Sequence, residues 1–253
     1  MRKLVRDTRL LFQRSLMYTL RNLVWVLLGL FQPVLYLLLF APLLNGLHAP
    51  AVTQSDALES FVPGLLVMMA LFSTAFAGFN IIEDLQGGVV ERLSVTPVSR
   101  LALLFGMILR DLLIFLIQGA LLLLVGTLMG MYISLPGIFL LSGLMILIGT
   151  LVTSFSYGIA LYLKDGTILS IALTTITQPL LLLSGVLLPL TLAHGTLRTL
   201  ALLNPFAHAV DAARTLTSGQ ISDPSIWQSF VIFALLTLCS TTWTMHIFRR
   251  AMA

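Results

Sequence analysis

Six long apolar stretches, separated by short polar segments, dominate the pattern of this 253-residue chain. In a helix, about 20 apolar residues cross the roughly 30 Å hydrocarbon core of a bilayer. The runs are unbroken and lack the alternation of barrel strands, so helices are favoured. The pattern predicts an all-α integral membrane protein with six transmembrane helices, at 22–45, 60–82, 101–131, 136–163, 167–190 and 226–248.

Composition supports this prediction. Hydrophobic residues make up 58% of the chain and charged residues 9%, which leaves too little polar surface for a soluble globule. The single cysteine, Cys239, falls inside the last stretch, so no disulfide framework is expected. The basic N-terminus resembles a signal peptide, but the apolar run after it is long and lacks a cleavage site. We therefore expect the first stretch to be retained as a span.

The distribution of Lys and Arg predicts the orientation of the chain. One side of the predicted membrane carries Arg2, Lys3, Arg6, Arg9, Arg14, Arg21, Arg92, Arg100, Lys164, Arg249 and Arg250. The other side carries only Arg198 and Arg214. Because cytoplasmic loops are rich in Lys and Arg, both termini are expected in the cytoplasm.

Residues 2–18 are predicted to form an amphipathic helix on the inner membrane surface. Its polar side carries Arg2, Arg6, Arg9 and Gln13, and its apolar side carries Leu4, Val5, Leu11, Phe12 and Leu16. Two interpretations stay open: a basic anchor, or a lever that contacts a cytoplasmic partner.

Two charges interrupt the third stretch. Residues 112–131 already cover the hydrocarbon core, so Arg110 and Asp111 fall at its inner edge. Snorkelling and the neighbouring counter-charge lower their cost there. Structural anchoring is favoured over an ion path.

An outer re-entrant helical hairpin, residues 191–217, is predicted between the fifth and sixth spans. The segment from Ser184-Gly185 to Pro189 is predicted to break the preceding helix while still apolar. Two short apolar pieces, 195–203 and 206–217, follow this break and are too short to span. Asp211 and Arg214 are three residues apart and can pair on one helix face, as a structural pair or as part of a gate. The candidate outer-gate residues are Ser184, Gly185, Pro189, Asn204, Pro205, Asp211 and Arg214.

The sequence lacks the motifs of several classes of membrane enzyme and of metal sites. Lys3 and Lys164 are the only lysines and neither follows a glycine, which excludes a phosphate-binding P-loop. The four histidines show no metal-ligand spacing, so no metal site is expected. A rhomboid-like protease needs Gly-x-Ser-Gly, but Leu182 stands where Ser184-Gly185 would require glycine.

The source of energy is also not apparent in the chain. No acid or base lies in the middle of a predicted span, and no channel filter or charged ring is visible. Energy must therefore come from another polypeptide. The polar segment 83–100, with five charged residues between two apolar stretches, is the best place for that partner to dock.

Three blocks of residues carry a family resemblance. They are Phe61-Val62-Pro63-Gly64-Leu65; then Glu83-Asp84, Gly87 to Leu93, Thr96 to Arg100 and Gly106; then Leu183-Ser184-Gly185, Pro189, Leu203 to Phe206 and Val210 to Arg214. In order and spacing the chain resembles the membrane permeases of type 2 ATP-binding-cassette (ABC) exporters. The nearest branch exports drugs, antibiotics and lipo-oligosaccharides in bacteria. One departure is Ala193-His194-Gly195, where relatives often have Pro and Trp.

The resemblance implies a single permease domain over 1–253 in a bacterial inner membrane. Two permeases, expected to be identical, pair and bind two cytoplasmic ATPase subunits, which hold ATP and Mg. A cytoplasmic coupling helix, expected at 83–97, sits in a cleft of the ATPase, and the N-terminal surface helix also touches it. The ATPase-coupling candidates are Glu83, Asp84, Gln86, Gly88, Glu91, Arg92 and Pro97. Solvation of the loop is the other interpretation of these charges, and a non-transporting scaffold or sensor is the alternative function.

The resemblance also places the substrate route between the two permeases, and the expected cargo is amphipathic. The candidate wall residues on the first and fifth spans are Gln32, Pro33, Thr174, Thr175, Gln178 and Pro179. Such residues hydrogen-bond to a cargo or to another helix. Alternatively, they only satisfy backbone groups freed by the prolines.

Overall fold

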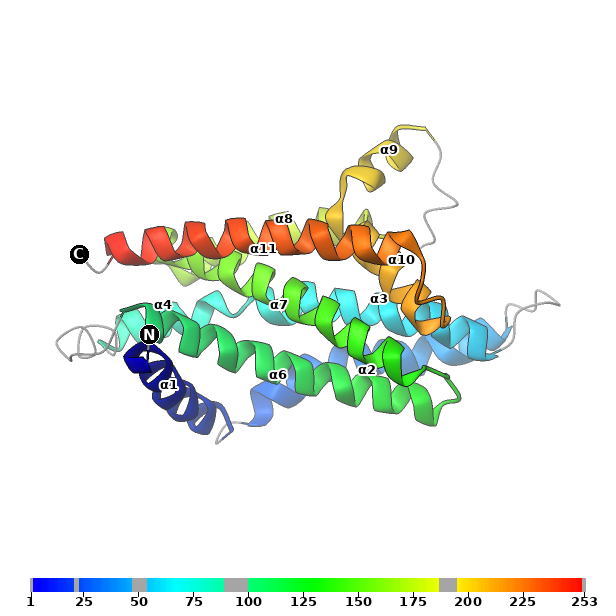
Figure 1. Cartoon of the computed structure of the whole chain (residues 1–253), viewed down its shortest axis with the longest axis horizontal. Coiled ribbons are helices and arrows are strands. Elements are labelled where there is room, and N and C mark those ends of the chain that lie inside the picture. The colour runs from blue at the N-terminus through cyan, green and yellow to red at the C-terminus, as the bar shows by residue number, and fades with distance from the viewer. Residues whose placement is uncertain (1, 21–22, 47–53, 89–99, 187–194, 252–253) are drawn as a thin grey trace.

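The computed structural model describes residues 2–20, 23–46, 54–88, 100–186 and 195–251, and every regular element in these ranges is a helix. Figure 1 shows most helices running along one axis, with α1 and the end of α11 at the same end of the molecule. The helices are α1 (Arg2–Leu20), α2 (Leu23–Gly46), α3 (Gln54–Ala75), α4 (Gly78–Gln86), α6 (Arg100–Leu128), α7 (Leu135–Leu163), α8 (Gly166–Leu182), α9 (Thr196–Leu203), α10 (Pro205–Thr217) and α11 (Pro224–Ala251).

Four helical stretches in the described ranges are long and apolar enough to cross a membrane: Leu58–Gln86, Leu101–Leu128, Leu135–Leu163 and Pro224–Arg250. Two shorter apolar stretches, Gly29–Phe40 and Gly166–Leu182, lie where the first and fifth spans were predicted. The all-helical prediction is confirmed for the described residues. The count of six spans stays a prediction.

Helix α3 forms the centre of the bundle. Every residue from Val62 to Leu71 is buried. Successive helical residues point about 100° apart, so a buried run of this length needs neighbours on all sides. Those neighbours are α2, α6, α7, α8 and α10.

The predicted continuous span 60–82 is interrupted in the structure. Helix α3 ends at Ala75 and α4 begins at Gly78. The Ser156 hydroxyl of α7 donates to the Ala75 carbonyl and accepts from the Gly78 N–H at 3.0 Å. A side-chain hydroxyl thus satisfies backbone groups freed by the break, as a broken membrane helix requires. A Cβ at position 78 would lie 2.6 Å from Ser156 Oγ, so glycine is needed for this approach.

Helix α8 is also shorter than its predicted stretch of 167–190, because it ends at Leu182. The Ser184 hydroxyl donates to the Leu181 carbonyl at 2.6 Å, and Gly185 adopts a left-handed φ of 76°. Glycine adopts this conformation without steric cost. The predicted break at Ser184-Gly185 is therefore present, while Pro189 lies outside the described residues.

Candidate functional site

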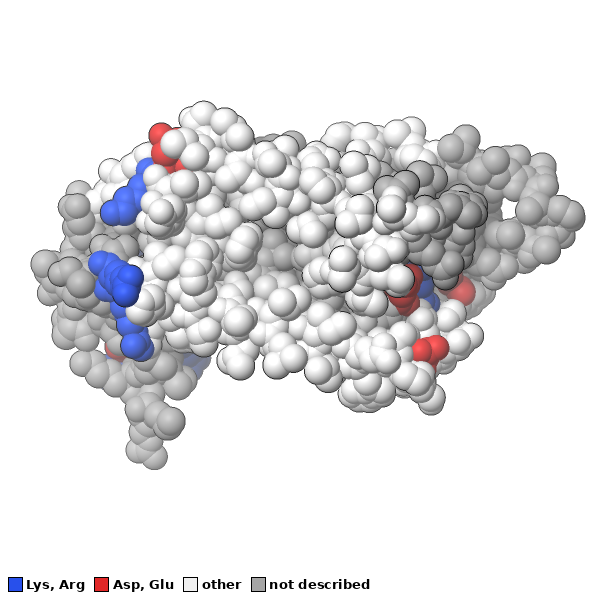
Figure 2. Space-filling model, turned by 90° about the horizontal axis from the view of Figure 1, so that it is seen from above, with Lys and Arg blue, Asp and Glu red and all other residues white. Residues whose placement is uncertain are grey.

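Positive charge gathers at the end of the molecule that carries α1 and the end of α11. Figure 2 shows Lys and Arg clustered there, while the middle of the same face carries neither sign of charge. The exposed cations of the described chain at this end are Arg6, Arg9, Arg14, Lys164, Arg249 and Arg250. The ends of α4, α7 and α11 and the start of α8 lie at this end.

The described coupling candidates lie on the last turn of α4 and just after it. Glu83 and Gln86 are exposed and Asp84 is partly buried. The Gly87 N–H donates to the Glu83 carbonyl at 2.8 Å, and Gly88 ends the helix with a left-handed φ of 66°. The helix that carries Glu83 therefore begins earlier than predicted and stops before residue 89. Glu91, Arg92 and Pro97 lie outside the described residues.

Helix α1 packs along α6 through a single row of residues on one of its faces. Asp7 is buried, and Leu11 and Ser15 follow at intervals of four residues on the same face. Gly106 of α6 allows the approach, because a Cβ there would lie 3.1 Å from Leu11 Cβ. The predicted polar side is confirmed where described, since Arg6 and its helical neighbours Arg9 and Gln13 are exposed.

A buried ion pair lies where α1, α6 and α7 meet. Arg110 and Asp111 are 5% and 9% exposed, and Arg110 Nε and Nη2 each lie 2.8 Å from Asp111 Oδ1. Arg110 Nη1 donates to Ser15 Oγ of α1 at 2.9 Å. The Tyr157 hydroxyl of α7 donates to Asp111 Oδ2 and accepts from Arg110 Nη2 at 3.4 Å. The four residues form the Arg110 cluster, which ties three helices together by charge-assisted hydrogen bonds.

The Arg110 cluster corrects one prediction. The neighbouring counter-charge is confirmed, but the Arg110 side chain is buried in protein and does not reach outward to water. Ser15 and Tyr157 were not predicted as members of this cluster, because they lie 95 and 46 residues away from their partners in the chain. The available signal was an ionisable pair within an apolar stretch, since such residues face the bundle interior.

At the opposite end, Arg214 bonds to backbone carbonyls. Its Nε donates to the Ser60 carbonyl and its Nη2 to the Gly185 carbonyl, both at 2.9 Å. No ion pair joins it to Asp211 in the described part of the chain, and Asp211 is exposed. The predicted pair is therefore wrong, and Arg214 connects α10 to α3 and the end of α8.

Asn204 and Pro205 mark the junction of the two predicted short helices, which are α9 and α10. The Asn204 side chain accepts from the Phe206 N–H at 3.0 Å and donates to the Leu180 carbonyl of α8 at 2.7 Å. It is an N-cap followed by proline at the first helical position. Figure 1 shows α10 against the bundle and α9 standing away from it. Their depth in a membrane stays a prediction.

The proposed wall residues occupy two helices that each pack on α3. Gln32 on α2 and the three α8 residues Thr174, Thr175 and Gln178 are exposed, as is Pro179, whereas Pro33 is buried. Thr175 donates its hydroxyl to the Ile171 carbonyl at 2.7 Å, so this hydroxyl is engaged within its own helix. Thr174 and Gln178 present exposed polar side chains, so they stay candidates for the wall of the route.

A polar contact inside the bundle lies next to Gln32. Gln118 of α6 is 2% exposed and accepts from the Ser73 hydroxyl of α3 at 2.9 Å. Gly29 of α2 packs directly on Gln118, since a Cβ there would lie 2.7 Å from Nε2. A cavity of about 20 Å³, lined by Gln32 and Ser73 among others, adjoins it. This contact places polar atoms beside one of the proposed walls.

Comparison with known proteins decides the family. The family model described as ABC-2 type transporter matches residues 6–217. The chain belongs to the ABC-2 type transporter family. It is 28% identical over 225 residues to ycf38, a candidate transport permease of Cyanophora paradoxa, covering 85% of this chain and 75% of that protein. It is 23% identical over 223 residues to the daunorubicin resistance ABC transporter permease protein DrrB1 of Streptomyces coeruleorubidus, covering 86% and 77%.

Membership of the ABC-2 family defines the general role of the chain. These permeases are the membrane subunits of ABC transporters and work with an ATPase partner. The absence of a phosphate-binding P-loop from the whole sequence fits such a non-catalytic subunit. The resemblance inferred from the three blocks of residues is confirmed.

Proposed function

We propose that this chain is the membrane-spanning permease of an ATP-driven exporter. It moves an amphipathic cargo, such as a drug, an antibiotic, a lipid or a lipo-oligosaccharide, from the cytoplasm or inner leaflet outward. Two copies of a separate cytoplasmic ATPase bind ATP and Mg and supply the energy. The name of the DrrB1 relative supports a drug as the class of cargo.

The Arg110 cluster is the observation that carries this proposal. The ATPase docks on the exposed end of α4, at Glu83 and Gln86, on the segment 89–97 and on α1. Movement of α1 reaches α6 and α7 through the contact between Ser15 and Arg110. The bond between Arg110 and Ser15 joins α1 to α6, and the Tyr157 hydroxyl joins α7 to the same ion pair, so we expect the three helices to move together.

The proposed topology has six spans, with both termini in the cytoplasm of a bacterial cell and α9 and α10 in the outer leaflet. The distribution of Lys and Arg supports this orientation. Two identical copies pair, and the cargo passes between their α2 and α8 helices. Cysteines at positions 32 and 178 should then crosslink between copies in at least one nucleotide state. Crosslinks confined to one copy would place the route elsewhere.

Co-expression with the ATPase tests the proposal. The ATPase should co-purify, hydrolyse ATP faster with the permease present, and drive export from vesicles. Replacing Glu91 and Arg92 by Ala should leave membrane insertion intact but lower both ATP turnover and export, because the docking charges are lost. Asp211→Ala, an exposed acid at the opposite end, is the control for ATPase binding. A permease that neither binds nor stimulates an ATPase would instead be a scaffold or sensor.

A further inference from the structure

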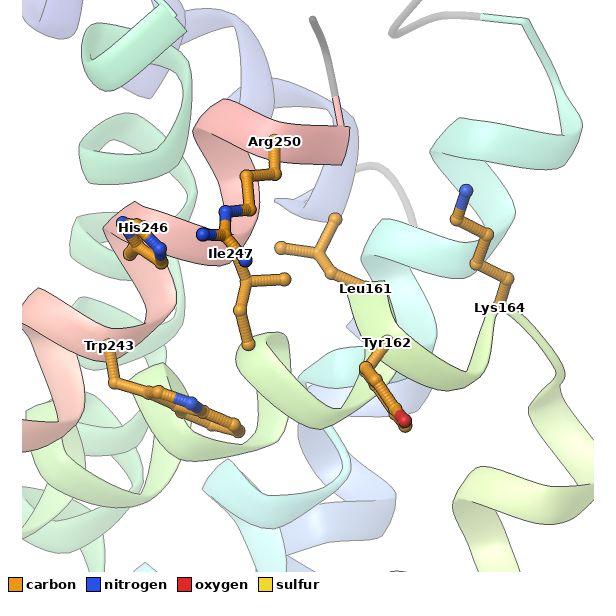
Figure 3. A pocket seen from close by; sticks show the side chains of 7 residues that line it. All are labelled: Leu161, Tyr162, Lys164, Trp243, His246, Ile247 and Arg250. Atoms are coloured by element: carbon orange, nitrogen blue, oxygen red, sulfur yellow. The ribbon is translucent and has the colours of Figure 1, made fainter.

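An amphipathic groove opens between the last turns of α7 and α11. Its cavity has a volume of about 570 Å³. Figure 3 shows Leu161 and Ile247 between an aromatic part, made of Tyr162 and Trp243, and a basic part nearer the helix ends, made of Lys164 and Arg250. His246 also lines the groove. The groove therefore joins apolar walls to fixed positive charge.

The aromatic part of the groove is built into the contact of α7 with α11. The ring of Trp243 lies directly over Gly158, where a Cβ would be 2.2 Å from Cζ3. The ring of Phe155 lies 5.8 Å from it between centroids. Three α11 hydroxyls hold the two helices together by donating to α7 carbonyls at 3.0, 3.2 and 2.6 Å: Thr237 to Leu147, Ser240 to Leu151 and Thr244 to Ser154. The groove is therefore a fixed feature of the helix pair.

In the basic part of the groove, the backbone at the end of α7 positions Lys164. Lys164 caps α7 with a φ of 53°, and it is the one residue other than glycine with positive φ in the described ranges. Such a conformation is uncommon for lysine. The nearby acid, Asp165, is engaged in accepting from the Ile168 N–H at 2.9 Å at the start of α8. Among the described residues neither Lys164 nor Arg250 forms an ion pair, so both cations can attract an anion.

We propose that this groove binds an anionic phospholipid of the leaflet at the cation-rich end. Its phosphate lies between Lys164 and Arg250, and an acyl chain runs past Leu161 and Ile247 beside the aromatic rings. Basic pockets between transmembrane helices on the cytoplasmic side bind anionic headgroups. Trp and Tyr prefer the depth at which headgroups meet acyl chains. The bound lipid would fill the groove and hold the ends of α7 and α11 together.

Quenching of Trp243 fluorescence tests the site directly. The chain has three tryptophans, and the double variant W25F/W227F leaves only Trp243. The full chain is reconstituted in phosphatidylcholine vesicles that contain either brominated phosphatidylglycerol or brominated phosphatidylcholine at equal mole fraction. Brominated phosphatidylglycerol should quench Trp243 more strongly. Arg250→Gln should lower this preference about fivefold, since each cation near an anionic surface contributes about 1 kcal/mol.

Arg249→Gln is the matched control, because Arg249 is the exposed neighbour with the same charge and does not line the groove. It should retain the preference, and Arg250→Lys should restore most of it. Lys164→Asn should lower the preference without backbone strain, because asparagine tolerates positive φ. Equal quenching by the two lipids, or equal losses in the Arg249 and Arg250 variants, would overturn the site. Protection of Trp243 from both lipids would show that a second copy covers the groove, which would also overturn it.

Discussion

The Arg110 cluster makes a specific prediction about stability. Arg110→Met removes the guanidinium and leaves the Asp111 carboxylate, which is 9% exposed, without its main partner. Breaking a buried ion pair by removing one partner costs about 3–5 kcal/mol. Asp111→Leu should cost a similar amount, because it leaves Arg110 charged and 5% exposed.

The double variant should be more stable than either single variant. Replacing both members of a buried pair by apolar residues of similar volume is often neutral or stabilising, because no uncompensated charge remains. Tyr157→Phe should cost less, about 1–3 kcal/mol, since one hydrogen-bonding group is lost at a buried carboxylate. The order of stability distinguishes a buried pair from an exposed one, which contributes only about 0–1 kcal/mol.

Equilibrium unfolding in mixed micelles measures these free energies, and export measures the role of the cluster in coupling. The R110M/D111L variant should fold but export poorly, because Ser15 of α1 loses its bond to Arg110. ATPase binding should persist, since the exposed end of α4 is unchanged. Additive losses in the double variant, or single losses below about 1 kcal/mol, would refute the argument. Normal export by the folded double variant would show that the Arg110 cluster is not needed to couple the ATPase to transport.

Three further results are expected. Gly78→Ala should destabilise the chain by about 1–3 kcal/mol, because the added Cβ would lie 2.6 Å from a hydroxyl oxygen of α7; an unchanged unfolding midpoint would contradict that packing. Arg214→Gln should cost about 1.5–3 kcal/mol through lost bonds to carbonyls, whereas Asp211→Asn should cost about 0.5 kcal/mol or less. Equal losses would argue that the two side chains pair after all. Thr199→Cys, in a chain lacking Cys239, should resist an impermeant thiol reagent from the cytoplasmic side, and labelling from that side would require another topology.

Local sequence signals accounted well for the helices themselves. The apolar runs predicted α2, α6, α7 and α11 to within a few residues. A run of about 20 apolar residues forms a membrane helix whichever other helices it packs against. Asn204-Pro205 marked the boundary between α9 and α10 for an equally local reason, since an N-cap and a first-turn proline act on their own helix. The family resemblance rested on blocks of this kind and is confirmed.

The break between α3 and α4 was not visible in the sequence. The stretch 60–82 carries no charge and is mostly apolar, and Ala75 and Gly78 carry no strong stop signal by themselves. The interruption depends on Ser156, which reaches both freed backbone groups from 78 and 81 residues further along the chain. A hydrogen-bonding partner that distant has no signature in local periodicity.

The partners of the charged residues were likewise decided by tertiary structure alone. Sequence spacing paired Arg214 with Asp211, but packing of α10 placed two backbone carbonyls within 2.9 Å of the guanidinium. The sequence also predicted that Arg110 reaches outward at the membrane edge. In the structure, α1 and α7 pack against it and bury it beside Ser15 and Tyr157. Hydropathy determines which segments become helices, because it depends on each segment and the bilayer. Which polar groups meet depends on how those helices pack, and that is a property of the whole bundle.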